Sequence, residues 1–166
     1  MVWSCLVSIL PGMAQTEKLT DYVNPFVGTD GYGNVYPGAQ IPFGGIQISP
    51  DTDSRFYDAA SGYKYNHLTL MGFSLTHLSG TGIPDLGDFL FIPGTGEMKL
   101  EPGTHEDPDQ GYRSRYSHDK EWASPNYYAV ELADYGVKAE MTSGVRSGMF
   151  RFTYPESDNA FIMIDM

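Results

Sequence analysis

Apolar and polar residues alternate most regularly in the last third of the chain, and this pattern predicts β-strands. Alternation is clearest along VKAEMT (137–142) and MFRFTY (149–154). NYYAVELA (126–133) and AFIMIDM (160–166) are largely apolar runs of strand length. Glycine, proline and asparagine turn signals separate the four segments. Short strands at this spacing predict an all-β protein that folds as an antiparallel β-sandwich.

The first half of the chain has weaker strand signals between long glycine-rich stretches. GIQIS (45–49) is typical of a short strand that ends at the following proline, and LTLMGFSLTHL (68–78) of a strand with a bulge at its glycine. DFLFIP (88–93) predicts a buried strand, with Leu90 and Phe91 in the core. No segment has the 3.6-residue period of an amphipathic helix.

Composition narrows the class of protein. The 166 residues are enough for one domain with a core, and a formal net charge of −11 argues against a nucleic-acid or anionic-membrane partner. With 19 glycines and 11 prolines, the chain is rich in turns. Cys5 is the single cysteine, so the chain can form no internal disulfide. These features suit a soluble module that binds a neutral ligand or a cation.

Both ends of the chain suggest a piece of a longer secreted protein. Residues 1–14 are apolar and uncharged and end in Gly12-Met13-Ala14, which resembles a truncated signal peptide cleaved after Ala14. No Lys or Arg precedes this run, so either the true start lies upstream or the run is an ordinary apolar N-terminus. We expect residues 15–166 to form the sandwich domain and to be cut off mid-strand, in a secreted or periplasmic protein.

The metal and nucleophile motifs in the chain are weak. The stretch 51–54 (DTDS) lacks an EF-hand's glycine and glutamate, since Phe56 and Gly62 stand at those positions. The stretch 105–107 (HED) has no second histidine at ligand spacing, and an acidic solvated loop is the better interpretation. Ser79 lacks the flanking glycine of a nucleophile elbow.

GFSLTHLSGTGIPDLGD (72–88) places glycines and short polar side chains directly before the predicted core strand. Glycines let a backbone approach a ligand closely, and short polar side chains can hydrogen-bond it. We expect His77 and Asp88 to serve a binding site or its lining. The alternative is that such residues only hold the turn, because a lone histidine is more often packed than functional.

Five motifs follow one another along the chain: VNPFVGTDGYGNVYPGAQIPFGGIQISPD (23–51), SGYKY (61–65), GFSLTHLSGTGIPDLGDF (72–89), YRSRYSHDKEWASPNYYAVEL (112–132) and EMTSGVRSGMFRFTYP (140–155). Together, from about Tyr22 to the end, they resemble the N-terminal domain of family 92 glycoside hydrolases. The resemblance implies a β-sandwich that packs on a larger C-terminal helical barrel. It also implies a secreted, inverting, calcium-dependent exo-α-mannosidase, with a mannose-containing glycan and the C-terminal module as partners.

The resemblance further implies that three loops, 28–38, 49–65 and 76–88, face the sugar or the domain junction. The implied substrate-binding residues are Gly28, Thr29, Asp30, Gly33, Asn34, Tyr36, Asp51, Tyr57, Tyr63, His77, Ser79, Asp85 and Asp88. In the family the catalytic acid and base and the calcium site belong to the C-terminal module. We therefore assign no catalytic or metal-binding residue to this chain.

Departures from the family pattern leave the linkage specificity open. Many relatives have tryptophan and cysteine where Tyr57 and Ala60 stand, and histidines where Leu75, Tyr32 and Asn34 stand. Two alternatives from other classes stay open: a stand-alone carbohydrate-binding sandwich and a structural spacer without a ligand.

Overall fold

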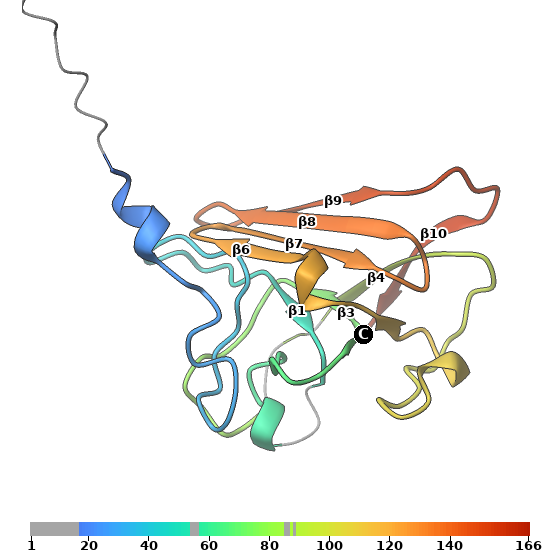
Figure 1. The fold of residues 1–166 in the computed structure, drawn as a ribbon, viewed down its shortest axis with the longest axis horizontal. Coiled ribbons are helices and arrows are strands. Elements are labelled where there is room, and N and C mark those ends of the chain that lie inside the picture. The colour runs from blue at the N-terminus through green and yellow to red at the C-terminus, as the bar shows by residue number, and fades with distance from the viewer. Residues whose placement is uncertain (1–16, 54–56, 85–86, 88) are drawn as a thin grey trace, which may run out of the picture.

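The structure is a computed structural model that describes residues 17–53, 57–84, 87 and 89–166. The predicted signal peptide and Cys5 lie outside these residues. Three antiparallel sheets form a sandwich, with the β6–β9 sheet above the sheet of β1, β3, β4 and β10 in Figure 1. Helical structure in the described ranges consists of short 3-10 turns: η1 (Leu19–Tyr22), η2 (Tyr57–Ala59), η3 (Pro108–Gln110) and η4 (His118–Lys120). The predicted all-β antiparallel sandwich is confirmed.

The upper sheet is a meander of neighbouring strands. Its strands are β6 (Glu121–Ser124), β7 (Tyr127–Leu132), β8 (Val137–Ser143) and β9 (Gly148–Thr153), in the order β6-β7-β8-β9. The last three match the predicted strands: alternation predicts β8 and β9, an apolar run of strand length predicts β7, and turn residues set their ends. Tight turns join them: Asn126, before β7, and Gly136, before β8, have positive φ angles of 59° and 64°.

The lower sheet brings together segments that are far apart in the sequence. Its strands are β1 (Ser49–Asp51), β3 (Gly72–Ser74), β4 (Leu90–Thr95) and β10 (Ala160–Asp165), in the order β1-β3-β4-β10. A separate two-stranded sheet pairs β2 (Thr69–Leu70) with β5 (Ser114–Arg115).

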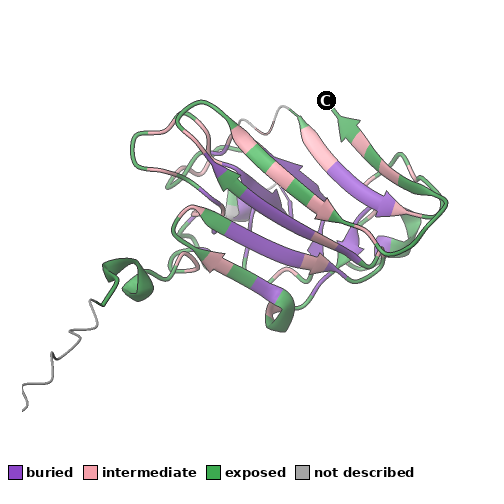
Figure 2. Cartoon of the chain, turned by 90° about the horizontal axis from the view of Figure 1, so that it is seen from above, coloured by how far each residue is buried: buried purple, intermediate pink, exposed green. Residues whose placement is uncertain are grey.

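The core lies between the sheets, where the buried face of β7 and β8 meets β3. Figure 2 shows long buried stretches along β7 and β8, whereas β9 and β10 alternate between exposed and half-buried residues. Aromatic rings connect the layers, with centroids 6.0 Å apart for Phe73 and Phe152 and 5.0 Å apart for Phe91 and Phe150. Burial of these rings and of the aliphatic residues of β7 and β8 stabilises the sandwich.

The prediction of a strand at 45–49 is wrong. Ile48 forms an isolated bridge with Ala39, and β1 then runs through Pro50 instead of ending before it. Pro50 is tolerated because β1 is at the edge of its sheet, where a missing N–H donor interrupts no ladder.

The prediction of one bulged strand across 68–78 is also wrong. The chain forms two short strands, β2 and β3, which meet at Met71 and pair with different partners. Gly72 permits this arrangement, because a Cβ there would lie 2.8 Å from the carbonyl oxygen of Phe91. The chain passes from one sheet to another within three residues, and the alternation of apolar and polar residues does not reveal such a switch.

The strand predicted at 88–93 begins later and is less buried than expected. β4 starts at Leu90, and Leu90 and Phe91 are half-buried rather than fully enclosed. Phe89 is 50% exposed. Sequence alternation does not predict how deeply a strand is buried. β4 lies beside β10, the last strand of its sheet, and is therefore close to the edge of the sheet.

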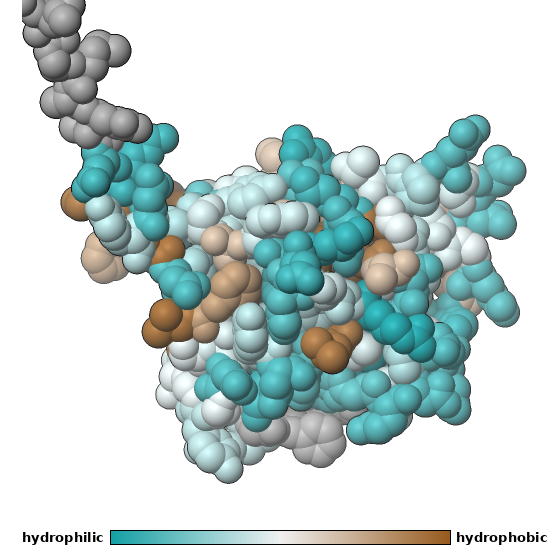
Figure 3. Space-filling view, in the orientation of Figure 1, coloured by the Kyte–Doolittle hydropathy of each residue, from teal (hydrophilic) through white to brown (hydrophobic). Residues whose placement is uncertain are grey.

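The face of the molecule seen in Figure 1 is mainly hydrophilic. Figure 3 shows a face covered mainly by hydrophilic side chains, with apolar side chains in separate small groups. Among the described residues, no helix has the length and apolar character needed to cross a membrane.

Candidate functional site

The three loops implied by the resemblance lie together at one side of the sandwich. We name them the glycine-rich loop (28–38), the central loop (49–65) and the third loop (76–88). The backbone N–H of Gly80 donates to the carbonyl of Asn34 at 2.7 Å, which joins the third loop to the glycine-rich loop. The N–H of Tyr65 donates to the carbonyl of Thr29 at 2.9 Å, which anchors the glycine-rich loop beside the end of the central loop. Main-chain bonds of this kind fix loop positions independently of side-chain identity.

A buried polar cluster, the His77 cluster, supports these loops. Nε2 of His77 lies 2.8 Å from Oδ1 of Asp51, and the Ser74 hydroxyl donates to Oδ2 of the same carboxylate at 2.6 Å. Nδ1 of His77 lies 2.6 Å from the carbonyl oxygen of Gln47. All three side chains are buried, so the strands β1 and β3 and the two loops that follow them are tied together.

His77 faces an acceptor at each ring nitrogen, and this sets its protonation. Burial lowers the pKa of His77, but the charge of Asp51 and the hydrogen bonds to Asp51 and Gln47 outweigh burial and raise it. A carbonyl and a carboxylate can only accept, so both ring nitrogens carry protons when both bonds form. The cluster is therefore an imidazolium–carboxylate pair whose donors are satisfied within the chain.

Gly62 allows the central loop to close over this cluster. Its φ is +88°, and a Cβ at this position would lie 2.3 Å from Oδ1 of Asp51 and 2.8 Å from Cδ2 of His77. The carbonyl of Gly62 accepts the N–H of Thr52 at 2.7 Å. A side chain would thus displace the Asp51–His77 pair, which explains why glycine is needed here.

A second buried cluster is centred on Glu121. Its carboxylate accepts hydrogen bonds from the hydroxyls of Tyr63, at 3.0 and 3.2 Å, and of Tyr128. Nδ1 of His118 lies 2.6 Å from Oε2 of Glu121, and the His118 ring stacks on Tyr65 with centroids 4.0 Å apart. Burial strongly raises the pKa of Tyr63 and of Tyr128, so both phenols remain donors. This cluster holds the end of the central loop against β6 and β7.

The predicted site residues fall into a buried and an exposed group. The buried ones are Thr29, Asn34, Tyr36, Asp51, Tyr63 and His77. The exposed ones are Gly28, Asp30, Gly33, Tyr57 and Ser79. Asp85 and Asp88 lie outside the described residues. The structure therefore brings the described residues of the three loops together. The buried group lies behind the loops in a supporting position, and the exposed group forms their surface.

Both the hydroxyls and the carboxylates of the buried group are largely occupied within the chain. The Thr29 hydroxyl donates to the carbonyl of Phe26 at 2.8 Å, and the Tyr36 hydroxyl donates to Gln40 at 2.7 Å. Burial raises the pKa of Tyr36 to about 12. Side chains in this state position the loops rather than exchange protons with a ligand.

In the stretch 105–107, Glu106 and Asp107 are exposed, as expected of a solvated acidic loop, whereas His105 is half-buried. Nδ1 of His105 lies 2.8 Å from the Thr69 hydroxyl, and Nε2 lies 3.5 Å from Oδ2 of the buried Asp53. Arg113 is also buried and contacts Thr69, with 3.3 Å between Nη1 and the hydroxyl oxygen. Sequence reasoning missed Ser74, Glu121 and Arg113, because each binds a residue more than 20 positions away.

The described residues do not fit a calcium site. Among them, no group of three or more His, Cys, Asp or Glu side chains is arranged to hold a metal ion. Asp51, the first carboxylate of the 51–54 stretch, is the last residue of β1 and is occupied by His77 and Ser74.

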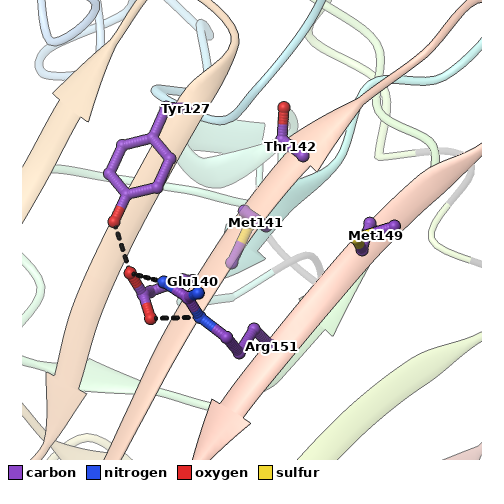
Figure 4. A pocket seen from close by; sticks show the side chains of 6 residues that line it. All are labelled: Tyr127, Glu140, Met141, Thr142, Met149 and Arg151. Carbon is purple, nitrogen blue, oxygen red and sulfur yellow. Dashed lines mark hydrogen bonds and ion pairs between the residues drawn. The ribbon is translucent and has the colours of Figure 1, made fainter.

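A shallow pocket of about 210 Å³ lies on the outer face of the upper sheet (Figure 4). The Glu140 carboxylate accepts two hydrogen bonds from Arg151, both 2.7 Å, and one from the Tyr127 hydroxyl at 2.7 Å. The Arg151 guanidinium and the Tyr127 hydroxyl lower the pKa of Glu140 to about 2. A carboxyl group that is ionised at neutral pH cannot protonate a leaving group, so Glu140 is not suited to be a general acid.

Comparison with known proteins gives a consistent result. The family described as "Glycosyl hydrolase family 92 N-terminal domain" matches residues 22–166. A protein of Arthroderma benhamiae described as an uncharacterized secreted glycosidase is 30% identical over 139 residues, which are 82% of this chain and 17% of that protein.

Two solved structures share the fold. A family GH92 inverting mannosidase from Bacteroides thetaiotaomicron is 28% identical, with a TM-score of 0.72 over 90% of this chain and 20% of its own. A gh92 family glycosyl hydrolase, ccman5, is 32% identical, with a TM-score of 0.68 over 82% of this chain and 19% of its own. The chain thus spans about a fifth of the length of these relatives.

Proposed function

The chain belongs to the N-terminal domain family of glycosyl hydrolase family 92, and on this premise we propose that it is the sugar-binding module of an exo-α-mannosidase. The observation that carries the proposal is the convergence of the three loops, with exposed residues in front of the buried His77 cluster. One solved relative is an inverting mannosidase, which supports mannose as the sugar.

In this proposal the chemistry is divided between two modules. Inverting hydrolysis needs a carboxylic acid that protonates the leaving oxygen and a carboxylate that activates water, about 6.5–9.5 Å apart. The buried carboxylates Asp51 and Glu121 are engaged by donors of this chain, and Glu140 is paired with Arg151. We place the catalytic acid and base, and a calcium ion that would orient the sugar hydroxyls, on a C-terminal module.

The contribution of this module is a rigid binding surface. Gly33 lets the glycine-rich loop fold close upon its own backbone, because a Cβ there would lie 2.2 Å from the carbonyl oxygen of Gly28. Asp30 and Ser79 supply short, exposed polar groups on these loops. His77 acts as a positioning residue, because it holds the loops while its ring nitrogens are occupied. Preorganised loops reduce the entropy that substrate binding would otherwise lose.

We further propose that the enzyme is secreted or periplasmic, with a mannose-containing glycan as its substrate. The similarity to a secreted glycosidase supports this localisation. Cleavage of residues 1–14 as a signal peptide would leave a mature protein that begins at Gln15. N-terminal sequencing of protein secreted from its natural start tests this point, and a mature protein that begins at Met1 contradicts it.

The function is tested by hydrolysis of an α-mannobiose, followed by NMR, with the enzyme that carries this module and all its other domains. We expect β-mannose as the first product and loss of turnover after calcium is chelated. Residues 15–166 alone should give no turnover. Hydrolysis by these residues alone, or no activity of the entire enzyme on α-mannosides, contradicts the proposal.

A further inference from the structure

Tyr32 and Tyr57 form an open aromatic pair where the glycine-rich loop meets the central loop. Their ring centroids are 6.3 Å apart and the rings are inclined by 54°. The two residues are 80% and 61% exposed. Within the described residues neither hydroxyl has a hydrogen-bond partner. Two neighbouring rings that remain open to solvent present apolar faces together with hydroxyl groups, which suits a ligand that has both kinds of surface.

The backbone fixes where each ring lies. Tyr32 stands between Gly31, with a φ of +61°, and Gly33, where a Cβ would lie 2.2 Å from the carbonyl oxygen of Gly28. The Tyr57 ring lies against Gly82, where a Cβ would be 2.1 Å from Cε2 of the ring. Glycines thus set the path of the Tyr32 loop and make room for the Tyr57 ring.

A buried amide on the same loop, two residues after Tyr32, gives a second, independent indication of a ligand. Asn34 is 7% exposed and adopts a φ of +48°, and its carbonyl accepts the N–H of Gly80. Its side-chain Oδ1 is buried without a hydrogen-bond partner among the described residues. Such an acceptor is costly unless a water or a ligand hydroxyl supplies the missing donor.

We propose that Tyr32, held beside Tyr57, is a specificity-determining residue that packs against the leaving-group sugar of the substrate. This inference rests on the proposed exo-mannosidase function. In an exo-acting enzyme the terminal sugar is enclosed, whereas the leaving-group sugar lies at the opening of the site. The exposed rings suit the opening, and their inclination leaves a face of Tyr32 clear for the C–H groups of a pyranose.

The experiment uses the entire enzyme and two substrates that differ in the leaving group. One is the α-mannobiose that the wild type cleaves fastest, and the other is α-mannosyl fluoride, whose leaving group is not a sugar. Tyr32→Ala should lower kcat/KM for the mannobiose about 3- to 10-fold and leave that for the fluoride unchanged. Tyr32→Phe should retain wild-type values, because the ring face is the contact.

The matched control is Tyr22→Ala, which removes another exposed tyrosine, in the 3-10 turn η1 outside the three loops, and should change kcat/KM for neither substrate. An equal loss on both substrates with Tyr32→Ala overturns the inference, as does no loss on either. If the wild type cleaves neither substrate, the proposed function itself is wrong. If the wild type is active and Tyr32→Ala has no effect, only the inference about Tyr32 is wrong. Melting temperatures of the variants check that each is folded.

Discussion

Asp51 and Glu140 are held by similar donors but in different surroundings. Each carboxylate accepts hydrogen bonds from a hydroxyl and from a cationic side chain, Ser74 and His77 for Asp51 and Tyr127 and Arg151 for Glu140. The Asp51 pair is enclosed by the sandwich and its loops, whereas Glu140 is covered by Arg151, whose side chain is 71% exposed.

The difference shows where an ion pair determines structure. The Glu140 side chain is only 9% exposed, but water reaches the pair through the exposed Arg151 and screens it, so its loss costs less than the loss of the enclosed pair. Removal of one partner of the enclosed pair leaves a buried charge. We therefore expect the positions of the three loops to depend on the His77 cluster. We expect the stability of the upper sheet to change little when Glu140 is replaced. The predictions below test this contrast, beginning with the largest effect.

His77→Ala should have the largest effect, because it leaves the Asp51 carboxylate buried without its cation. We expect a loss of about 3–5 kcal/mol in the stability of this module. Hydrogen–deuterium exchange should become faster in peptides that cover residues 47–52 and 72–77. Ser79→Ala is the matched control in the same loop and should exchange as the wild type does. Unchanged exchange in the His77 variant would show that the cluster does not hold the loops.

Gly62→Ala should have the second-largest effect on stability. The substitution strains a residue with a φ of +88° and places a methyl group against Asp51 and His77. We expect a loss of about 2–4 kcal/mol. Gly96→Ala is the control for backbone strain alone, because Gly96 has a φ of +83° but a Cβ there would meet no other atom within 4 Å. Equal melting temperatures for the two variants would refute the close contact.

The contribution of His77 should also depend on pH. Its pKa is raised in the folded protein above the ordinary value of 6.5, so the stabilisation is complete below about pH 6.5. It is lost as the pH rises through the folded-state pKa, because the unfolded protein no longer binds that proton. The difference in melting temperature between the wild type and His77→Gln should thus shrink towards alkaline pH. A difference that grows with pH would contradict the imidazolium assignment.

Glu140→Gln should have the smallest effect. The carboxylate pairs with an exposed arginine, and such pairs contribute less than about 1 kcal/mol. We expect a melting temperature within about 2 °C of the wild type and unchanged exchange in the loops. A loss as large as that of His77→Ala would remove the contrast between the two carboxylates.

Local features of this fold could be predicted from the sequence, whereas contacts between distant residues could not. Strands β8 and β9 follow from local alternation, β7 follows from an apolar run between turn residues, and the five motifs indicate the family. The His77 cluster joins residues 26 positions apart, and the bond from Tyr63 to Glu121 spans 58 positions. No local pattern encodes such pairs, so the roles of Ser74 and Glu121 and the supporting position of His77 needed the structure.

Short strands were missed for a related reason. β5 and β6 are polar and only two and four residues long, so their pairing is decided by tertiary contacts. The exposure of Tyr57 and its contact with Gly82 likewise depend on how two loops meet. Residue type and the family motifs suggested the three loops as binding loops, whereas folding decides which of their side chains are exposed.

The central claim is that the buried His77 cluster positions the three loops and that their exposed residues contact the sugar. A crystal structure of the entire enzyme with a thio-linked, non-hydrolysable α-mannobiose tests it most directly. We predict that the disaccharide lies against the exposed residues of the glycine-rich and central loops, Tyr32 included, with the Asp51–His77 pair intact behind them and out of contact with the ligand. A disaccharide bound away from these loops, or one hydrogen-bonded directly to His77, would contradict this account.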